Sequence, residues 1–515
     1  MASIWDRCLR RKSLDRLVAD TESPAYRLKR SLGPVQLTAL GIGAIVGAGI
    51  FSTVGSAAAG GSQHLGAGPA LAVSFVLVAV ACGFAALCYA EFASMAPVAG
   101  SAYTYAYATL GELVAWIIGW DLILEYAVGN VAVAISWSAY FQELLRGLGI
   151  TWPCWLGTDL RSAIQAAAQV AKLKAEAGDL TILGGAALRD ALALETAPRV
   201  FGLPIVFNLP ALLIVAAITW VLVIGIRESA RFNTIMVILK LIVVAFFLVV
   251  GALYVKPENW HPFAPNGVYG IWSAAAIIFF AYIGFDAIST AAEEARNPQR
   301  DMPIGIIASL VICTVFYVAV AVVLTGMASW KTLGTAEPLA SAFEPLGLRW
   351  VPGIIAVGAL LANTSVLIAF QLGQPRIFFS MARDGLLPAW AATVHPKYRT
   401  PHVTTILTGV FVAVFASVTN INEMVELTNI GTLFAFLLVA AGVIVLRVIR
   451  PEWPRPFRTP FVPVVPLLAM CCSALLMIAL PVVTWIRFIL WLVAGLIVYF
   501  LFGVRRSKLN QTEQL

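Results

Sequence analysis

The stretch that decides the fold reads Gly41-Ile-Gly-Ala-Ile-Val-Gly-Ala-Gly-Ile-Phe51. It lies inside an apolar block at about residues 35–60. A block of this length can cross a hydrocarbon layer of about 30 Å as a helix. Four glycines within nine residues, however, make a poor helix interior. The stretch therefore predicts a membrane-spanning helix that is broken near its middle.

The whole chain has the composition of a membrane protein. Of its 515 residues, 60% are hydrophobic and only 12% are charged, whereas about a quarter of a soluble domain is charged. These proportions predict an all-α polytopic membrane protein with 12 transmembrane helices. The apolar spans run at about residues 35–60, 69–92, 112–146, 203–226, 231–255, 270–293, 303–327, 350–375, 402–420, 427–449, 462–481 and 485–504.

Three segments lie outside these spans. Residues 1–34 are basic and amphipathic, which is typical of a segment that lies on anionic membrane lipid. The loop at 147–202 follows the third span, and its stretch 158–174 has the apolar spacing of a helix. Residues 505–515 form a short tail. Apart from the loop, no segment is long enough for a soluble domain between spans.

The basic residues indicate the orientation. They are more frequent in the segments on the side of the two termini, and half of those on the opposite side lie in the single loop at 147–202. The positive-inside rule therefore places both termini in the cytoplasm, in a bacterial-type inner membrane. The net charge of +7 needs no nucleic-acid partner.

A second break is predicted in the sixth span, at Phe279-Phe-Ala-Tyr-Ile-Gly-Phe-Asp286. It lies five spans after the first break, and an odd offset gives opposite orientations, as an inverted repeat requires. Unwound backbone at both breaks would hold a zwitterion, with N–H groups facing its carboxylate and carbonyls facing its ammonium group. For Gly43 and Gly47 alone, close helix packing is the alternative. The glycine spacing is not a dinucleotide-binding fingerprint.

Ionisable residues at membrane depth are candidates for function. Lys240 lies in the middle of the fifth span, about 10 Å from either end of its helix. Either it binds and releases a proton, or it is a fixed charge that pairs with carbonyls. Glu125 in the third span is a candidate for the substrate pathway. We expect Asp121 to form a hydrogen bond between helices and Asp286 to cap a half-helix.

Acidic residues near the terminal-side ends of the spans are expected to be interfacial. These are Glu91, Glu293 and Glu294.

Several motifs, in order along the chain, resemble the cationic amino acid transporter family of the amino acid–polyamine–organocation superfamily. Besides residues 41–51 they are Tyr89-Ala-Glu-Phe-Ala-Ser-Met-Ala-Pro-Val-Ala-Gly-Ser-Ala-Tyr103, Phe279 through Ile288, Glu293-Glu-Ala-Arg-Asn-Pro-Gln-Arg-Asp-Met-Pro303, Arg383-Asp-Gly-Leu-Leu-Pro388 and Thr400-Pro-His-Val-Thr-Thr-Ile-Leu-Thr-Gly409. The resemblance covers about residues 30–465. It implies a LeuT-type 5+5 inverted repeat, residues 35–255 and 270–449, followed by two C-terminal helices at 462–504.

The resemblance also implies a substrate site. The substrate carboxylate would meet the backbone of Gly47, Ala48 and Gly49, and the ammonium group the carbonyls of Ile45, Phe280 and Ile283. Val46 and Ala281 complete the two broken segments, and Phe280 matches an aromatic gate. Lys240 matches a lysine that replaces a sodium ion of sodium-coupled relatives, which favours proton coupling. Glu125 matches an acid of the side-chain pocket.

One residue departs from the family's pattern. The position of Phe370 in the eighth span tends to carry a small residue in animal members, and a phenylalanine there would narrow the side-chain pocket. Long cationic substrates are therefore not implied by the family's name.

We expect a proton-coupled transporter of L-amino acids that works by alternating access. An obligate amino acid exchanger and an amino-acid-sensing membrane receptor are the alternatives. Cysteines and histidines show no ligand spacing, and no catalytic motif is found, so no metal, cofactor or enzymatic activity is expected. A small accessory membrane protein or a second copy of the chain is left open as a partner.

Overall fold

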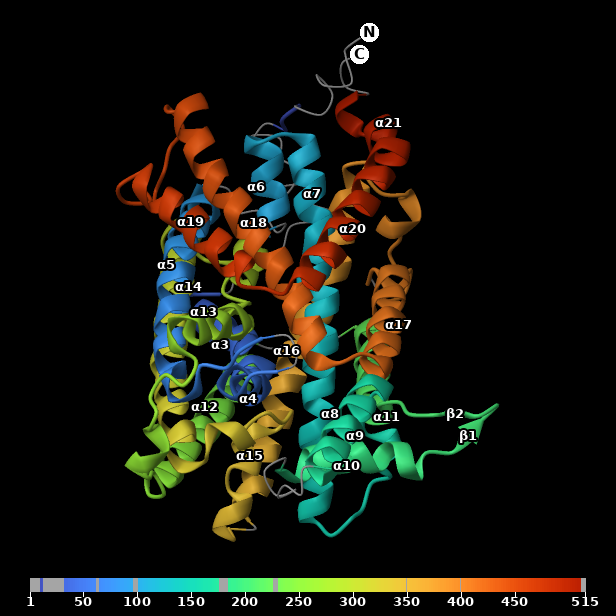
Figure 1. Ribbon diagram of the computed structural model, residues 1–515. Helices are drawn as coiled ribbons and strands as arrows, with labels where there is room; N and C mark the ends of the chain where they lie inside the picture. Colours follow the sequence, from blue (N-terminus) through green and yellow to red (C-terminus); the bar gives the residue numbers. More distant parts are fainter. Residues whose placement is uncertain are drawn as a thin grey trace.

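A computed structural model describes residues 10–12, 32–61, 64–95, 101–175, 184–225, 230–348, 350–398 and 400–510. Long helices lie side by side along one axis of the molecule (Figure 1). Both termini lie at one end, beside α6, α7 and α21, which we call the terminal end. Helices α9, α10 and α15 lie at the opposite end, which we call the distal end.

The first half of the chain forms α3 (Pro34–Ile45), α4 (Val54–Ala59), α5 (Leu71–Met95), α6 (Ser101–Thr109), α7 (Glu112–Ile123), α8 (Gly129–Gly147), α9 (Leu160–Ala175), α10 (Gly184–Thr196), α11 (Leu209–Ile224) and α12 (Ala230–Ala252). The second half forms α13 (Gly267–Ile278), α14 (Pro298–Met327), α15 (Pro338–Ser341), α16 (Val351–Arg383), α17 (His402–Val418), α18 (Ile421–Ile449), α19 (Val464–Ile478), α20 (Val482–Val498) and α21 (Val504–Arg506). Strands β1 (Arg199–Val200) and β2 (Leu203–Pro204) pair antiparallel.

The helix lengths agree with a polytopic membrane protein. Among the described residues, eight helices are long and apolar enough to cross a membrane, or nine if the bent pair of residues 34–45 and 49–59 is one span. Three shorter apolar helices, α11, α17 and α19, lie where further spans are predicted. The count of 12 spans stays a prediction.

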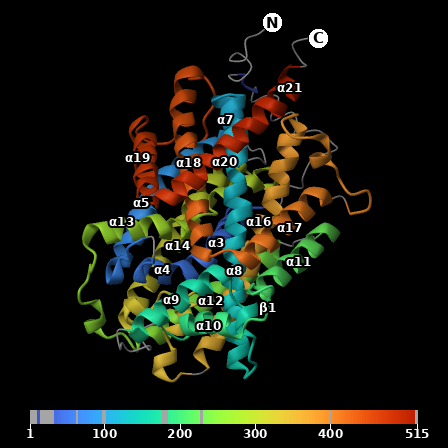
Figure 2. The ribbon, with the colours of Figure 1, turned by 45° about the vertical axis from the view of Figure 1, so that its right-hand side comes forward.

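The outward faces of these helices are apolar, as lipid contact requires. Val249 of α12 is 68% exposed and Leu490 of α20 is 64% exposed. The helices pack through their other faces. Helix α14 packs against α5 and α3, α16 against α8, α18 against α19, and α11 against α17. Figure 2 shows α8 as a long vertical element between α16 and α3.

The loop at 147–202 is partly as predicted. The expected helix at 158–174 is present as α9. A second helix, α10, and the β1–β2 hairpin were not expected. Ala163 and Ala193 are fully buried in a small apolar cluster of their own, against which Trp155 packs. The loop is thus a compact cap on the distal end.

Most of the predicted N-terminal surface segment lies outside the described residues. Residues 10–12 dock on the terminal end, where the Lys12 amide donates to the Tyr107 carbonyl oxygen at 3.1 Å. The Arg10 carbonyl oxygen accepts from the Glu112 amide at 2.9 Å.

Candidate functional site: two broken helices and the spaces around them

The first predicted break is present. Helix α3 ends at Ile45, and Val46 has extended backbone angles of φ −79° and ψ 97°. A π-helical turn, Gly49–Thr53, then leads into α4, and the two parts of the span are bent by 41°. We call residues 46–49 the first break. The glycine-rich sequence explains it, because glycines stabilise neither half across the bend.

The second predicted break is also present. Helix α13 ends at Ile278, a tight helical turn follows at Phe279–Tyr282, and Ile283 is extended with φ −60° and ψ 134°. Gly284 has φ +120°, a conformation that side chains rarely adopt. A β-carbon there would lie 2.8 Å from the Ala44 carbonyl carbon. Gly284 is therefore required both by its own backbone and by the close approach of α3. We call residues 279–285 the second break.

The two breaks lie against each other, although they are more than 200 residues apart in the sequence. A β-carbon at Gly49 would lie 2.2 Å from the Ala281 α-carbon. A β-carbon at Gly47 would lie 2.7 Å from Val366 Cγ2 of α16. Val46, Ala48 and Ala281 are each at most 1% exposed. The backbone groups of both breaks thus meet in one buried place.

Lys240 of α12 reaches this place. Its side chain is fully buried, and Nζ donates to the carbonyl oxygens of Gly43 at 2.8 Å and Val46 at 3.0 Å. These carbonyls belong to the end of α3 and the first break. The lysine therefore holds the point where the first span unwinds. No ion pair of Lys240 occurs within the described part of the chain.

Two of the three carbonyls expected to hold an ammonium group, those of Ile45 and Phe280, have partners of their own. The Ile45 oxygen accepts from the Tyr317 hydroxyl of α14 at 3.0 Å. The Phe280 oxygen accepts from the Ile283 amide at 3.4 Å, which is a long hydrogen bond. A carbonyl oxygen has two lone pairs, so each retains capacity for a second donor.

Glu125 and Asp286 lie close together in the interior. Glu125 sits on a π-helical turn, Leu124–Val128, between α7 and α8. Neither Glu125 oxygen has a hydrogen-bond partner among the described residues. Two ionised carboxylates buried close together repel each other, so this pair needs a proton or a cation. Asp286 also accepts from the Gly284 amide at 3.3 Å. The second half-helix, however, begins after Phe285 without a side-chain cap, so the expected capping by Asp286 is not found.

Two other acidic residues differ from expectation. Neither carboxylate oxygen of Asp121 has a hydrogen-bond partner among the described residues, so the predicted hydrogen bond between helices is not found. Glu91 is not interfacial but 1% exposed. It accepts two hydrogen bonds from the Arg447 guanidinium, at 3.0 and 2.8 Å, and one from the Thr459 amide at 2.8 Å.

Phe370 of α16 lies beside the π-helical turn that carries Glu125. It is 2% exposed, and its ring meets that of Tyr126 edge to face at 5.5 Å. A β-carbon at Gly129 would lie 3.4 Å from the Phe370 ring. The phenylalanine therefore fills the space between α16 and α8 next to Glu125.

Two polar residues near the breaks were missed from the sequence. The Asn429 amide of α18 donates to the carbonyl oxygens of Ala276 at 2.7 Å and Ile277 at 3.1 Å, at the end of α13. Tyr317 holds the end of α3, as described above. An asparagine inside an apolar span was a signal that could have been followed.

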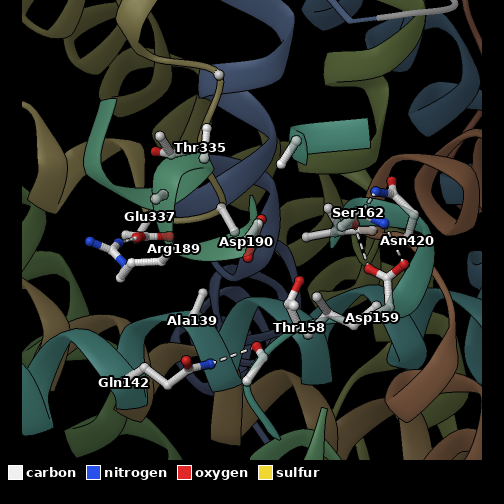
Figure 3. A pocket seen from close by; sticks show the side chains of 18 of the residues that line it. Ala139, Gln142, Thr158, Asp159, Ser162, Arg189, Asp190, Thr335, Glu337 and Asn420 are labelled. Atoms are coloured by element: carbon white, nitrogen blue, oxygen red, sulfur yellow. Dashed lines mark hydrogen bonds and ion pairs between the residues drawn. The ribbon is translucent and has the colours of Figure 1, made fainter. Parts of the chain in front are cut away.

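A cavity of about 660 Å³ opens at the distal end, between the first span and the α9–α10 cap. It begins at Ser52, Thr53 and Ser56, just beyond the first break. None of the predicted binding residues at 45–49 lines it. Figure 3 shows Asp190 and Thr158 facing each other across this space. Burial raises the pKa of Asp190 to about 7, against the effects of the Thr158 hydroxyl and Arg189.

The described residues contain no cluster of histidine, cysteine, aspartate and glutamate side chains that could hold a metal ion. At the breaks the structure shows backbone groups of both broken segments, the Lys240 ammonium group and the Glu125 and Asp286 carboxyls.

The sequence was compared with known proteins. The profile of the amino acid permease family matches residues 32–502. A branched-chain amino acid permease of Bacillus subtilis is 47% identical over 504 residues, covering 98% of this chain and 99% of that protein. A methylthioribose transporter of the same organism is 44% identical over 502 residues, with coverage of 98% and 99%.

A vacuolar cationic amino acid transporter 4 of Arabidopsis thaliana is also similar. It is 36% identical over 450 residues, covering 86% of this chain and 68% of that protein. These relatives are permeases and transporters by name, and none is named as an enzyme.

Proposed function

Because this chain belongs to the amino acid permease family, within the amino acid–polyamine–organocation superfamily, we propose that it is a proton-coupled transporter of neutral L-amino acids that works by alternating access. Amino acid transport and a polytopic membrane fold follow from the family. The substrate class, the coupling and the site are the proposal. It is carried by one observation: the two helix breaks touch, and a buried lysine holds the first of them.

The substrate carboxylate binds the backbone N–H groups of Gly47, Ala48 and Gly49. Its ammonium group binds the carbonyl oxygens of Ile45, Phe280 and Ile283, with Val46 and Ala281 forming the rest of the two breaks. Backbone dipoles at the ends of half-helices suit a zwitterion, because they offer opposite partial charges close together. The breaks are in contact in the structure, so substrate entry requires them to separate.

The substrate side chain is neutral and apolar. Phe370 and Tyr126 present aromatic surface beside Glu125, and Phe370 occupies space that a long cationic side chain would need. The branched-chain amino acid permease is a relative whose name agrees with this class. The methylthioribose transporter is nearly as similar, but a neutral sugar would use neither charge-complementary end of the breaks.

Lys240 carries the coupled proton. While protonated it donates to Gly43 and Val46 and holds the first span. A neutral amine donates more weakly to carbonyls, so deprotonation releases the break and biases the access equilibrium. The rival function is obligate exchange, in which Lys240 stays charged throughout the cycle. The hydrogen bonds fit both, and transport data must separate them.

The membrane arrangement is 12 spans with both termini in the cytoplasm of a bacterial inner membrane. Spans 1–5 and 6–10 form inverted repeats, and α19 and α20 are appended. Support comes from the nine long spans, the three shorter apolar helices and the basic residues on the terminal side. The terminal end is then cytoplasmic and the distal end external.

Reconstituted uptake tests the function. Purified protein in sealed vesicles is given radiolabelled leucine, arginine or methylthioribose, with the outside acid or at symmetric pH. We expect leucine to accumulate above equilibrium only under the acid-outside gradient. Uptake that requires an amino acid inside the vesicles, at either pH, would identify an exchanger. Uptake of methylthioribose in preference to leucine would overturn the substrate class.

A further inference from the structure

The cavity at the distal end has a well-defined lining, because contacts on several sides attach the α9–α10 cap to the spans. Arg189 of α10 pairs with Glu337 beside α15 at 2.8 Å. The Asn420 amide before α18 donates to Ser162 of α9 at 2.6 Å. Gln142 of α8 donates to the Gly157 carbonyl oxygen at 2.8 Å. These contacts hold the cap in place over the cavity.

The cavity lining carries more negative than positive charge. Its acidic residues are Asp159, Asp190 and Glu337, and its basic residues are Arg146 and Arg189. Both arginines already face carboxylates: Arg189 pairs with Glu337, and Arg146 lies 2.6 Å from Glu143. Asp159 accepts from the amides of Arg161 and Ser162 at the start of α9.

Asp190 is different from these groups. It faces Thr158 across the space (Figure 3), and no ion pair is formed by it within the described residues. The acid nearest to it in charge interaction is Glu337, which disfavours a second negative charge. A positively charged donor would relieve this repulsion and satisfy the carboxylate. An ammonium group, with three donors, fits the position.

We propose that the cavity under α9 and α10 is a second, external binding site that recognises the ammonium group of an amino acid through Asp190 and Thr158. It lies next to Ser52 and Thr53, which lie a few residues beyond the first break. A molecule bound there would lie close to the proposed central site. This assigns a role to the loop at 147–202. The part of the proposal that concerns uptake rests on the proposed function; the binding site itself does not.

Cys154 provides a native probe, because it lines the cavity and is a free thiol. Purified full-length protein is treated with iodoacetamide, and alkylation of Cys154 is followed by mass spectrometry of its peptide. Leucine, isopentylamine and 4-methylpentanoate are added in turn. Isopentylamine has the ammonium group of leucine and lacks the carboxylate that the central site requires. 4-Methylpentanoate has the carboxylate and lacks the ammonium group. A Cys154→Ser variant confirms the assignment of the peptide.

We expect leucine and isopentylamine to slow alkylation and 4-methylpentanoate to leave it unchanged. At a ligand concentration that half-protects the wild type, Asp190→Asn should lose most of the protection, because a charge-assisted hydrogen bond contributes about tenfold in affinity. Glu258→Gln, an exposed acid outside the cavity, is the matched control and should keep it. Protection by 4-methylpentanoate alone, or full protection in Asp190→Asn, would overturn the proposal.

Uptake kinetics give an independent readout. Asp190→Asn should raise KM for leucine uptake about tenfold and leave the maximal rate unchanged, since the central site is intact. An unchanged KM would contradict a role of the external site in uptake. Absence of leucine uptake by the wild type would instead count against the proposed function, while the protection by isopentylamine would still decide the external site.

Discussion

The two ends of the molecule are built in opposite ways. At the terminal end, buried carboxylates join segments that are far apart in sequence. Asp384, after α16, accepts from Lys12 at 2.9 Å and from the Tyr103 hydroxyl at 2.8 Å. Glu112 accepts from Tyr107 at 3.0 Å and from Tyr499 at 3.1 Å. At the distal end, comparable charged groups line a cavity instead.

This difference indicates which side of the central site is sealed. Hydrogen bonds to charged groups are among the stronger individual interactions in proteins. At the terminal end they tie the N-terminal segment, α6, α7 and α16 together, so a path to that side requires several of them to break. At the distal end the cavity begins at Ser52 and Thr53, a few residues beyond the first break. In the proposed transport cycle, the structure corresponds to the state closed on the terminal side.

The largest effect is expected midway between the two ends, where the breaks touch. Gly49→Val should abolish leucine binding, because its side chain would meet the Ala281 backbone and fill the place of the substrate carboxylate. Gly47→Val should do the same. Binding is measured by thermal shift and by scintillation proximity with purified protein.

A compensated variant separates blocked binding from disturbed packing. Gly47→Ala clashes with Val366, and Gly47→Ala combined with Val366→Ala removes that clash. The double variant should fold normally and still bind leucine poorly. If it binds as well as the wild type, the carboxylate is held elsewhere.

The seal at the terminal end can be broken directly. Asp384→Asn weakens the ion pair with Lys12 and the hydrogen bond from Tyr103, so the terminal side should open more often. In a Ser289→Cys background, alkylation of this fully buried position should become about ten times faster, as expected for losing a bond of roughly 1.5 kcal/mol. Glu452→Gln is the control, since its pair with Arg450 is 3.7 Å long and exposed. Equal rates in both variants would show that the network does not seal the pathway.

A substitution at Phe370 should change substrate selectivity and leave the hydrogen bonds at the terminal end unchanged. Phe370→Ser removes the ring that packs on Tyr126 and opens space next to Glu125. We expect the ratio of arginine to leucine uptake to rise about tenfold. Phe370→Leu should retain the preference for leucine. Efficient arginine transport by the wild type would mean that Phe370 does not limit the pocket.

The smallest effect concerns pH at the distal end. The raised pKa of Asp190, about 7, means that the carboxylate loses its charge as the external pH falls from 8 to 6. Glu337 and Asp159 act on it from neighbouring elements, and Arg189 acts on it from its own helix, α10. At symmetric pH, KM for leucine should be about threefold higher at pH 6 than at pH 8. Asp190→Asn should show no such difference; the same pH dependence in that variant would place the titrating group elsewhere.

The sequence was sufficient to predict elements that depend on local chemistry. Glycines at 41–49 and at 284 predicted both breaks, because backbone freedom is a property of the residue itself. Apolar spacing predicted α9. The functional role expected for Lys240, a lysine in an apolar span, stays a prediction; the structure adds the two carbonyls to which it donates.

Features that depend on contacts between distant residues could not be predicted. Glu91 was expected at an interface, but Arg447, 356 positions later, folds over it and makes burial tolerable. The cavity is formed by residues from the first span, α8, the cap and the start of α18. No local sequence pattern predicts that these segments come together. Asp121 has no partner among the described residues, and we have no physical account of it.

Lys240 lies between the terminal and the distal end. The central claim is that Lys240 binds and releases the coupled proton. The most direct test compares leucine uptake by wild type, Lys240→Ala and Lys240→Arg in vesicles, with the outside acid and at symmetric pH. We predict that Lys240→Ala transports at a rate independent of the gradient, and that Lys240→Arg stalls because arginine does not deprotonate. Full gradient-driven accumulation by Lys240→Ala would contradict the account and move the proton to the Glu125–Asp286 pair.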